Sequence, residues 1–300
     1  MIRYFVCDDV TSLISKRKME INSYERMIMR TDEKYVKPIF VYSYSIFEST
    51  ITEILRYYLN AFPEKINGDI NIEKEQLLST PMTYDILVNY MENYIRKYSG
   101  KSLSDYLAFF EKTLVIEISL DSKLVDKISE QRNIIVHDSS KSDLLSLYTN
   151  NLKLPCSNRA ELHSYIQHLN NILDIIRDKI CSKYAKYTKE KLVRFVWKDV
   201  FSSPILQFDE IWSFNESGAL IIRDIKSLKE KIESISSTEG LFLAIFFQQF
   251  NSNLNEELLS FKEIPSLVSL DNENKNKVIE LINFFKYYPL FFGGEGIKKM

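Results

Sequence analysis

Apolar residues recur at spacings of three and four along the first two thirds of the chain, a pattern typical of helices buried along one side. The spacing predicts helices over residues 8–30, 38–60, 84–98, 103–114, 122–137 and 158–187. Asp8 or Asp9 is expected to cap the first helix, and Pro38 suits the first turn of the second. The clearest stripe belongs to the last segment and consists of Leu162, Ile166, Leu169, Leu173, Ile176 and Ile180. The sequence therefore predicts a mainly α-helical protein.

The pattern changes after about residue 190. Two short apolar segments, 207–214 and 219–222, flank the turn-forming sequence Asn215-Glu216-Ser217-Gly218 and fit a β-hairpin. Helices are predicted again over residues 224–236, 238–259 and 272–288, and the apolar run 241–247 is expected to be core or interface. We therefore expect two domains, residues 1–190 and residues 191–300, the second mostly helical.

Composition restricts the classes of function. Hydrophobic residues make up 45% of the chain, enough for a core, and a formal charge of −2 argues against a generally basic nucleic-acid coat. Only two of the seven glycines precede residue 218, which argues against a glycine-rich phosphate loop or a dinucleotide fingerprint. Three widely spaced cysteines support neither a disulfide framework nor a zinc site. No apolar run reaches membrane-spanning length, so we expect a cytoplasmic protein with no metal, no cofactor and no membrane contact.

The segment Arg132-Asn133-Ile134-Ile135-Val136-His137 places a cation, an amide and an imidazole near the end of a predicted helix. Arginine neutralises phosphate at any physiological pH, and histidine can transfer protons near neutrality. On a helix Asn133 and His137 share a face, whereas Arg132 projects about 100° away from Asn133. Two such helices packed about a two-fold axis could bring the three groups together. The segment therefore suggests phosphate-ester chemistry, on RNA, at a site that two copies share.

Two other interpretations of this segment stay open. The β-branched residues at 134–136 fit a short buried strand, or the segment is an ordinary helix end with a structural histidine. The helical stripe that favours helix over strand consists of Leu124, Val125, Ile128 and Ile135. Spacing alone does not distinguish a catalytic His137 from a structural one.

Glu48 is a carboxylate within an otherwise apolar helical stripe. The apolar members of this stripe are Phe40, Tyr44, Ile51, Leu55 and Leu59. A buried carboxylate needs a partner, and an ion pair with Arg132 would fix the guanidinium while leaving donors for phosphate. Alternatively, Glu48 lies at the edge of an interface and is solvated.

The sequence Glu-Gln-Arg-Asn-Ile-Ile-Val-His-Asp over residues 130–138 resembles the signature of HEPN domains, an arginine, a polar residue, several mostly apolar residues and a histidine. The helix that contains Phe47-Glu48-Ser49 is similar to the family's acidic helix, and the helix over 158–187 is similar to its last helix. The resemblance covers about residues 20–190. It implies a HEPN-like antiparallel helical bundle that dimerises and brings two Arg-to-His motifs together.

Active HEPN members are metal-independent endoribonucleases, frequent among prokaryotic toxins and anti-phage defence proteins. By this resemblance His137 would assist proton transfer as the RNA 2′-hydroxyl attacks the adjacent phosphate, and Arg132 would stabilise the charge on the phosphorane. Asn133 would orient the phosphate or the imidazole, and Glu48 would anchor the arginine. The products would carry a 2′,3′-cyclic phosphate and a 5′-hydroxyl.

The resemblance also suggests partners: RNA as substrate, a second copy of the chain, and an antitoxin or defence-system protein. The alternative function is a non-catalytic HEPN module that binds RNA, nucleotide or protein and dimerises. In one subtype a tyrosine two positions after the histidine is modified by a partner nucleotidyltransferase. Ser139 stands at that position here, which argues against this form of control.

A basic stretch is a second candidate for contact with RNA. From Arg177 to Asp199 there are eight lysines and arginines against three acids, with aromatic residues between them. Lys179, Lys183 and Lys186 share one helical face and are the RNA-binding candidates, because cations attract phosphate whatever the base sequence. The alternative is a solvated helix face with its aromatic residues turned into the core.

Overall fold

The computed structural model describes residues 5–66, 83–138, 158–201, 203–214, 220–250, 253–260 and 262–287. The described chain is mainly helical and contains a two-stranded antiparallel sheet. It divides into two compact units, one of residues 5–186 and one that contains residues 187–300. None of the helices in the described ranges combines the length and the apolar character needed to cross a membrane.

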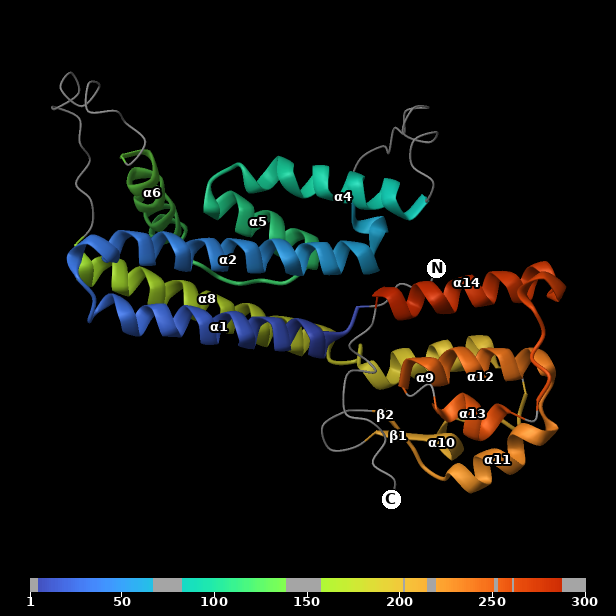
Figure 1. Cartoon of the computed structure of the whole chain (residues 1–300). Helices are drawn as coiled ribbons and strands as arrows, with labels where there is room; N and C mark the ends of the chain where they lie inside the picture. Colours follow the sequence, from blue (N-terminus) through green and yellow to red (C-terminus); the bar gives the residue numbers. More distant parts are fainter. Residues whose placement is uncertain are drawn as a thin grey trace. The chain divides into compact units, whose positions relative to one another are not determined.

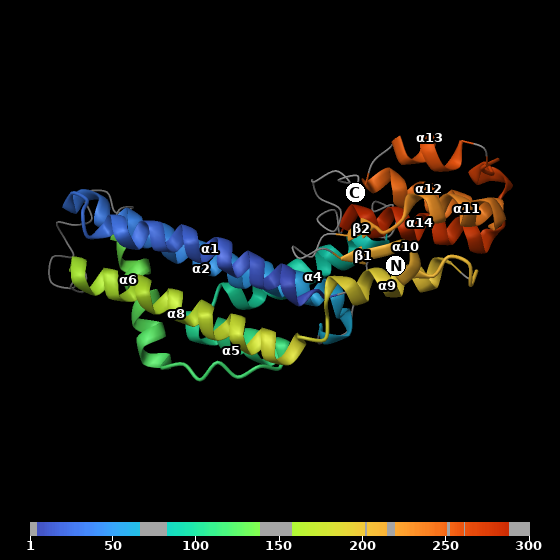
Figure 2. The same cartoon turned by 90° about the horizontal axis from the view of Figure 1, so that it is seen from below.

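Three long helices form the body of the first unit and lie side by side along most of their length (Figures 1 and 2). They are α1 (Cys7–Ile28), α2 (Glu33–Ala61) and α8 (Arg159–Tyr184). The 3₁₀ turn η1 (Pro63–Lys65) follows α2. Three further helices pack against α2: α4 (Thr83–Ser99), α5 (Leu103–Leu114) and α6 (Ser122–Asp138). The helices predicted from apolar spacing are therefore present, and the unit is a helical bundle.

The start and the buried stripe of α8 agree with the prediction. The amide of Glu161 donates to Asn158 Oδ1 over 3.0 Å, and the amide of Asn158 donates to a Glu161 carboxylate oxygen over 3.1 Å. This reciprocal pair satisfies two amides that a helix start leaves without partners. All six predicted stripe residues of this helix, from Leu162 to Ile180, are buried.

The starts of α1 and α2 differ from the prediction. Val6 is the N-cap residue of α1 and makes no side-chain cap, so the prediction that an aspartate caps this helix is wrong. Asp8 and Asp9 lie instead in the first turn, where carboxylates interact favourably with the helix dipole. Pro38 lies inside α2, because this helix already begins at Glu33. Pro38 has no backbone N–H, so the carbonyl of Lys34 lacks its usual partner within the helix. This position lies near the helix start and is exposed, so water can bond to that carbonyl instead.

Helix α6 crosses α2 steeply instead of running along it, as Figures 1 and 2 show from two sides. A short loop over residues 115–121 connects α5 to α6. Its residues Val115 and Ser119 adopt left-handed backbone conformations, and the Ile118 amide donates to the Glu111 carboxylate. Helix α6 includes residues 132–137, so the interpretation of this segment as a buried strand is wrong.

The second unit is built from short elements. In chain order they are α9 (Lys189–Val200), α10 (Phe208–Ile211), β1 (Trp212–Phe214), β2 (Leu220–Ile222), α11 (Ile225–Ser234), α12 (Ser237–Phe250), α13 (Asn253–Leu259), the 3₁₀ turn η2 (Leu267–Ser269) and α14 (Asn272–Tyr287). The predicted hairpin is present with Ser213 opposite Ile221, but residues 208–211 are helical instead of extended. The expected turn 215–218 lies outside the described residues. The helix predicted over 238–259 is two helices, α12 and α13.

An aromatic cluster forms the core of this unit. The ring centroid of Trp197 lies 5.2 Å from that of Phe246 and 5.8 Å from that of Trp212. The Trp197 indole donates to the carbonyl of Leu206 over 2.8 Å, so its polar edge is satisfied inside the core. The apolar run 241–247 contributes Phe246 and three more buried residues, which confirms its expected place in the core.

Candidate functional site

Arg132 lies on α6 at the point where this helix crosses α2, and its side chain is half-buried. The guanidinium carbon lies 5.7 Å from the ring centroid of Tyr44, within the range of a cation–π contact. One terminal nitrogen, Nη1, donates to Asn133 Oδ1 over 3.0 Å. The Nε–H group is shielded from solvent and has no hydrogen-bond partner among the described residues. The guanidinium is therefore held in place while keeping donors for an anion.

Tyr44, on α2, is almost fully buried beneath this arginine. Its hydroxyl donates to Ser129 Oγ over 3.3 Å, one turn before Arg132 on α6. Burial raises the pKa of the Tyr44 phenol, and its hydrogen bond with Ser129 and the charge of Arg132 oppose that rise only in part. Tyr44 is therefore a neutral ring at physiological pH.

Glu48 lies one helical turn after Tyr44 and is half-buried at the same crossing. Burial raises the pKa of its carboxyl group, and the positive charge of Arg132 lowers it by a smaller amount. Glu48 and Arg132 thus interact electrostatically. Among the ion pairs of the described residues, however, none within 4.0 Å joins these two side chains.

Tyr44 and Glu48 begin a row of hydrogen-bonding side chains that recurs every four residues along α2. The row consists of Tyr44, Glu48, Thr52 and Arg56. The Thr52 and Tyr106 hydroxyls are 2.8 Å apart, and Arg56 Nη2 donates to Glu92 over 2.8 Å. Burial raises the pKa of Tyr106 to about 12, with Glu48 adding to the rise and Thr52 opposing it. The row joins α2 to α6, α5 and α4 in turn.

The other two members of the Arg-to-His motif are placed less completely. Asn133 is exposed on α6 and is bonded to its neighbour Arg132. His137 belongs to the last turn of α6, but its side chain lies outside the described part of the chain. The structure therefore brings Arg132, Asn133 and Glu48 into one neighbourhood and puts the backbone of residue 137 on the same helix.

The predicted RNA-binding lysines lie far along α8 from this crossing. Lys127 of α6 lies 5.9 Å from the ring centroid of Tyr165, which marks where α6 passes α8. Lys183 lies about 27 Å further along α8 at about 1.5 Å per residue, and its ammonium group donates to the carbonyl of Val115. Lys179 and Lys186 are exposed. The structure does not bring these lysines to Arg132.

The aromatic residues of the same basic stretch mostly serve the two cores. Tyr184 is buried, and its hydroxyl donates to the carbonyl of Leu114 over 2.6 Å. Trp197 is buried in the second unit, whereas Phe195 is 56% exposed. The interpretation that the aromatic residues turn into the core is therefore correct for Tyr184 and Trp197.

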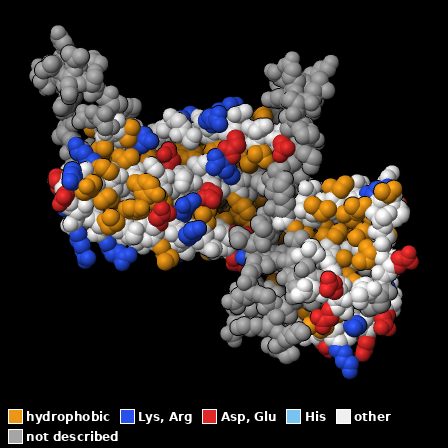
Figure 3. Space-filling model, in the orientation of Figure 1, with side chains coloured by type: hydrophobic (Ala, Val, Ile, Leu, Met, Phe, Trp, Pro, Cys, Tyr) orange, Lys and Arg blue, Asp and Glu red, His pale blue; other side chains and the backbone are white. Residues whose placement is uncertain are grey.

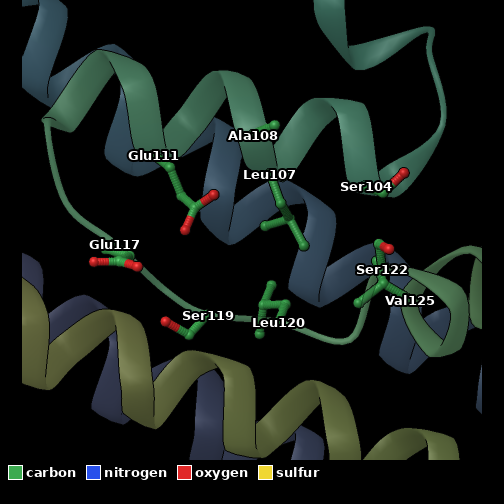
Figure 4. Close-up of a pocket in the computed structure, with 9 residues that line it drawn as sticks. All are labelled: Ser104, Leu107, Ala108, Glu111, Glu117, Ser119, Leu120, Ser122 and Val125. Atoms are coloured by element: carbon green, nitrogen blue, oxygen red, sulfur yellow. The ribbon is translucent and has the colours of Figure 1, made fainter.

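A cavity of about 320 Å³ opens at the other end of α6 (Figure 4). It is lined by Ser104, Leu107, Ala108, Glu111, Glu117, Ser119, Leu120, Ser122 and Val125. Val125 precedes Arg132 by about 10 Å of helix, and none of the predicted site residues lines this space. The cavity is therefore separate from the candidate site. Within the described ranges, no group of three histidine, cysteine or acidic side chains is placed to hold a metal ion.

The sequence patterns indicate Arg132 and Glu48 but not the ring partner of the arginine, Tyr44, or the residue that accepts a hydrogen bond from its hydroxyl, Ser129. Tyr44 was assigned to the apolar stripe of α2, and Ser129 carried no signal. The recurrence of hydroxyl and charged groups every four residues of α2 was the available signal, since residues at that spacing share a helix face.

Comparisons with known proteins found no protein-family model, no curated protein and no solved structure that matches this chain. The function therefore has to be argued from the residues of the site and their surroundings.

Proposed function

We propose that the chain is a metal-independent endoribonuclease of the HEPN type, a toxin or anti-phage effector whose active site forms at a homodimer interface. The observation that carries this proposal is the guanidinium of Arg132. It is fixed between Tyr44 and Asn133, and it keeps a solvent-shielded Nε–H group with no partner among the described residues. A cation that is immobilised while its donors stay open is suited to a phosphate with developing negative charge.

The proposed reaction is cleavage of RNA by its own 2′-hydroxyl. His137 takes the proton of this hydroxyl as its oxygen attacks the adjacent phosphorus, and the bond to the 5′-oxygen breaks while that oxygen takes a proton from water. His137 then returns its own proton to solvent. Arg132 offsets the added charge on the phosphorane, and Asn133 orients the phosphate or the imidazole. The products are a 2′,3′-cyclic phosphate and a 5′-hydroxyl, and neither step requires a metal ion.

Two features of the first unit support a second copy at this site. Ile134, Ile135 and Val136 stay partly exposed on the last turns of α6, although all three are apolar. In addition, five exposed side chains that recur on one face of α2 over about four turns are themselves uncharged: Tyr35, Pro38, Tyr42, Ser45 and Ser49. Charges lie only beside them, with Lys34 Nζ 4.8 Å from the Tyr35 ring centroid and Glu20 accepting from the Tyr42 hydroxyl. Figure 3 shows hydrophobic side chains gathered at the end of the bundle where α1 ends and α2 begins.

The two serines of this face fit burial against another helix. Ser45 Oγ donates to the carbonyl of Val41 over 2.9 Å, and Ser49 Oγ donates to the carbonyl of Ile46 over 3.2 Å. Because their hydroxyl protons are already bonded within α2, losing water there costs little, and their small size permits close helix approach. We therefore place the second copy on this face of α2.

The catalytic part of the proposal is tested by incubating the purified full-length protein with total RNA in EDTA. Wild-type protein should release fragments with 2′,3′-cyclic phosphate and 5′-hydroxyl ends, and Arg132→Ala and His137→Ala should not. Arg194→Ala is the matched control, an arginine of the second unit that should leave cleavage unchanged. Intact RNA after incubation with the wild-type protein would contradict the proposal and favour a non-catalytic binding module. Full cleavage by both variants would contradict the assignment of Arg132 and His137 as catalytic residues.

The dimer is tested by sedimentation velocity. Ser45→Lys puts a charge among the uncharged side chains on this face of α2 and should shift the protein from dimer to monomer. Ser164→Lys is the control, because Ser164 is also exposed on a helix of the same unit but lies on α8. Equal dimer fractions in both variants would move the second copy to another face, and a wild-type monomer at all concentrations would argue against the shared site.

A further inference from the structure

Tyr44 has two independent contacts with α6 although it belongs to α2. Its ring lies under the guanidinium of Arg132, with 5.7 Å between the guanidinium carbon and the ring centroid. Its hydroxyl donates to Ser129 Oγ over 3.3 Å. Ser129 and Arg132 are three residues apart and so lie on one face of α6. Helix α6 therefore fixes the ring through the hydroxyl of Tyr44, and the same helix provides the arginine that lies over the ring.

The ring contact differs in kind from the ion pair expected between Arg132 and Glu48. A carboxylate would accept two N–H groups of the guanidinium and neutralise its charge. An aromatic face attracts the cation and accepts none of its in-plane N–H donors. Among the described residues, the Arg132 side chain donates a hydrogen bond to Asn133, and its Nε–H has no partner.

We infer that Tyr44, fixed by Ser129, is the positioning residue of Arg132 in the proposed ribonuclease site. This inference rests on the proposed function and identifies what holds the arginine. Tyr44 does not touch the phosphate and acts through Arg132 alone. Its ring sets the place of the guanidinium while leaving the full positive charge and the open donors for the reacting phosphate. Glu48, one turn further along α2, contributes an electrostatic field at this place without binding the arginine.

The alternative is that Tyr44 is an ordinary core residue whose ring happens to lie beneath an arginine. The two roles predict different results for changes that keep or remove the ring. If Tyr44 positions Arg132, Tyr44→Phe keeps the cation–π contact and most of the activity, whereas Tyr44→Leu removes both. If Tyr44 is only core, both variants should change stability and leave the chemistry of the folded fraction unaltered.

The first measurement is the rate of RNA cleavage by the folded full-length variants. Tyr44→Leu should lower kcat about tenfold with little change in KM, as expected when a cation–π contact is lost from a desolvated site. Tyr44→Phe should stay within about threefold of wild type, and Ser129→Ala should fall between the two. Tyr98→Leu is the matched control, because Tyr98 is a partly exposed tyrosine of α4 whose ring has a different cation over it, Lys101 Nζ at 5.0 Å from the ring centroid.

The second measurement reads the position of Arg132 without any reference to activity. In NMR spectra the Nε–H and Cδ protons of Arg132, assigned through Arg132→Lys, should carry an upfield ring-current shift. This shift should persist in Tyr44→Phe and in Tyr98→Leu, and it should disappear in Tyr44→Leu. Should Tyr44→Leu be too unstable to study, Ser129→Ala serves in its place with a smaller change of the same sign.

The two measurements separate this inference from the proposed function. An unchanged ring-current shift in Tyr44→Leu, or wild-type kcat in that variant, overturns the role of Tyr44 while the ribonuclease proposal stands. If wild-type protein does not cleave RNA but the shift disappears only in Tyr44→Leu, the ring holds the arginine and the proposed function is wrong.

Discussion

Two arginines, one in each unit, lie over aromatic rings and are used in opposite ways. Arg194 on α9 lies 4.7 Å from the ring centroid of Phe208, and it also donates to Asp209 over 2.7 Å and to Glu190 over 2.8 Å. Arg132 lies over Tyr44 and has no carboxylate within ion-pair distance among the described residues. Two carboxylates offset the positive charge of Arg194, whereas no ion pair among the described residues offsets the charge of Arg132. An aromatic ring therefore holds a guanidinium without neutralising it, whereas a pair of carboxylates offsets its charge.

The sharpest test of this difference is to remove each arginine in turn. Arg132→Ala should reduce RNA cleavage by about 10²–10³-fold, the usual cost of losing a group that stabilises transition-state charge. Arg194→Ala should leave the cleavage rate within about twofold and lower the free energy of unfolding by no more than about 1 kcal/mol, because its ion pairs are largely exposed. Cleavage kinetics in EDTA and urea unfolding measure the two effects. Similar losses of activity in both variants would remove the distinction.

The ring under Arg194 should matter chiefly for stability. Phe208 is buried and lies edge-on to Trp197, with 6.0 Å between ring centroids. Phe208→Ala should therefore lower the free energy of unfolding by about 3 kcal/mol through the cavity that it leaves. Phe195→Ala, on the exposed side of α9, should change it by less than about 0.5 kcal/mol. Urea denaturation followed by circular dichroism compares the two, and equal effects would show that Phe208 is not a core residue.

The carboxylates near the two arginines should respond to pH in opposite directions. The folded pKa of Glu48 is raised above 4.5 by burial, so its ionisation costs stability as pH rises through that raised value. The folded pKa of Asp209 is lowered below 3.8 by Arg194, so its contribution is present above pH 3.8 and is lost as pH falls further.

The corresponding variants make this a direct measurement. Glu48→Gln should be more stable than wild type at pH 7, and the gain should vanish near pH 4. Asp209→Asn should be less stable than wild type at pH 7, and that loss should shrink as pH falls below 3.8. Both effects should be smaller than that of Phe208→Ala, and they are read from unfolding free energies across pH. A loss of stability in Glu48→Gln at pH 7 would mean that its carboxylate is paired after all.

The smallest predicted effect concerns the lysines at the far end of α8. Because they lie far from Arg132, they can contribute only general attraction for phosphate. Lys179→Ala combined with Lys186→Ala should leave kcat unchanged and reduce the slope of log affinity against log salt by about 1.4 for single-stranded RNA. Fluorescence anisotropy over a range of salt concentrations measures this slope. An unchanged slope would exclude these lysines from the RNA path.

Local signals predicted most helices of the chain, because the signals and the structure share the same cause. The stripe from Leu162 to Ile180 is a property of neighbouring residues on one helix, and it was predicted. Residues 208–211 were not predicted as helix. There the conformation is supported by long-range contacts, the ion pair of Asp209 with Arg194 and the packing of Phe208 on Trp197, which no local pattern contains.

The candidate site shows the same limit. Arg132 and Glu48 were identified from residue type and spacing, but their relation depends on how steeply α6 crosses α2. That crossing puts the Tyr44 ring beside the guanidinium. Among the described residues, no carboxylate oxygen lies within 4.0 Å of it. A helical stripe shows that Tyr44 is buried and does not show which helix covers it.

The aromatic core of the second unit has a practical consequence for physical work on this protein. The chain has two tryptophans, Trp197 and Trp212, and both lie in that core with their ring centroids 5.8 Å apart. Intrinsic tryptophan emission therefore reports on the unit that contains residues 187–300 and is silent about the bundle that carries Arg132. Emission and far-ultraviolet dichroism followed on one sample would show whether the two units melt together, and each would keep its own spectroscopic signature with no added label.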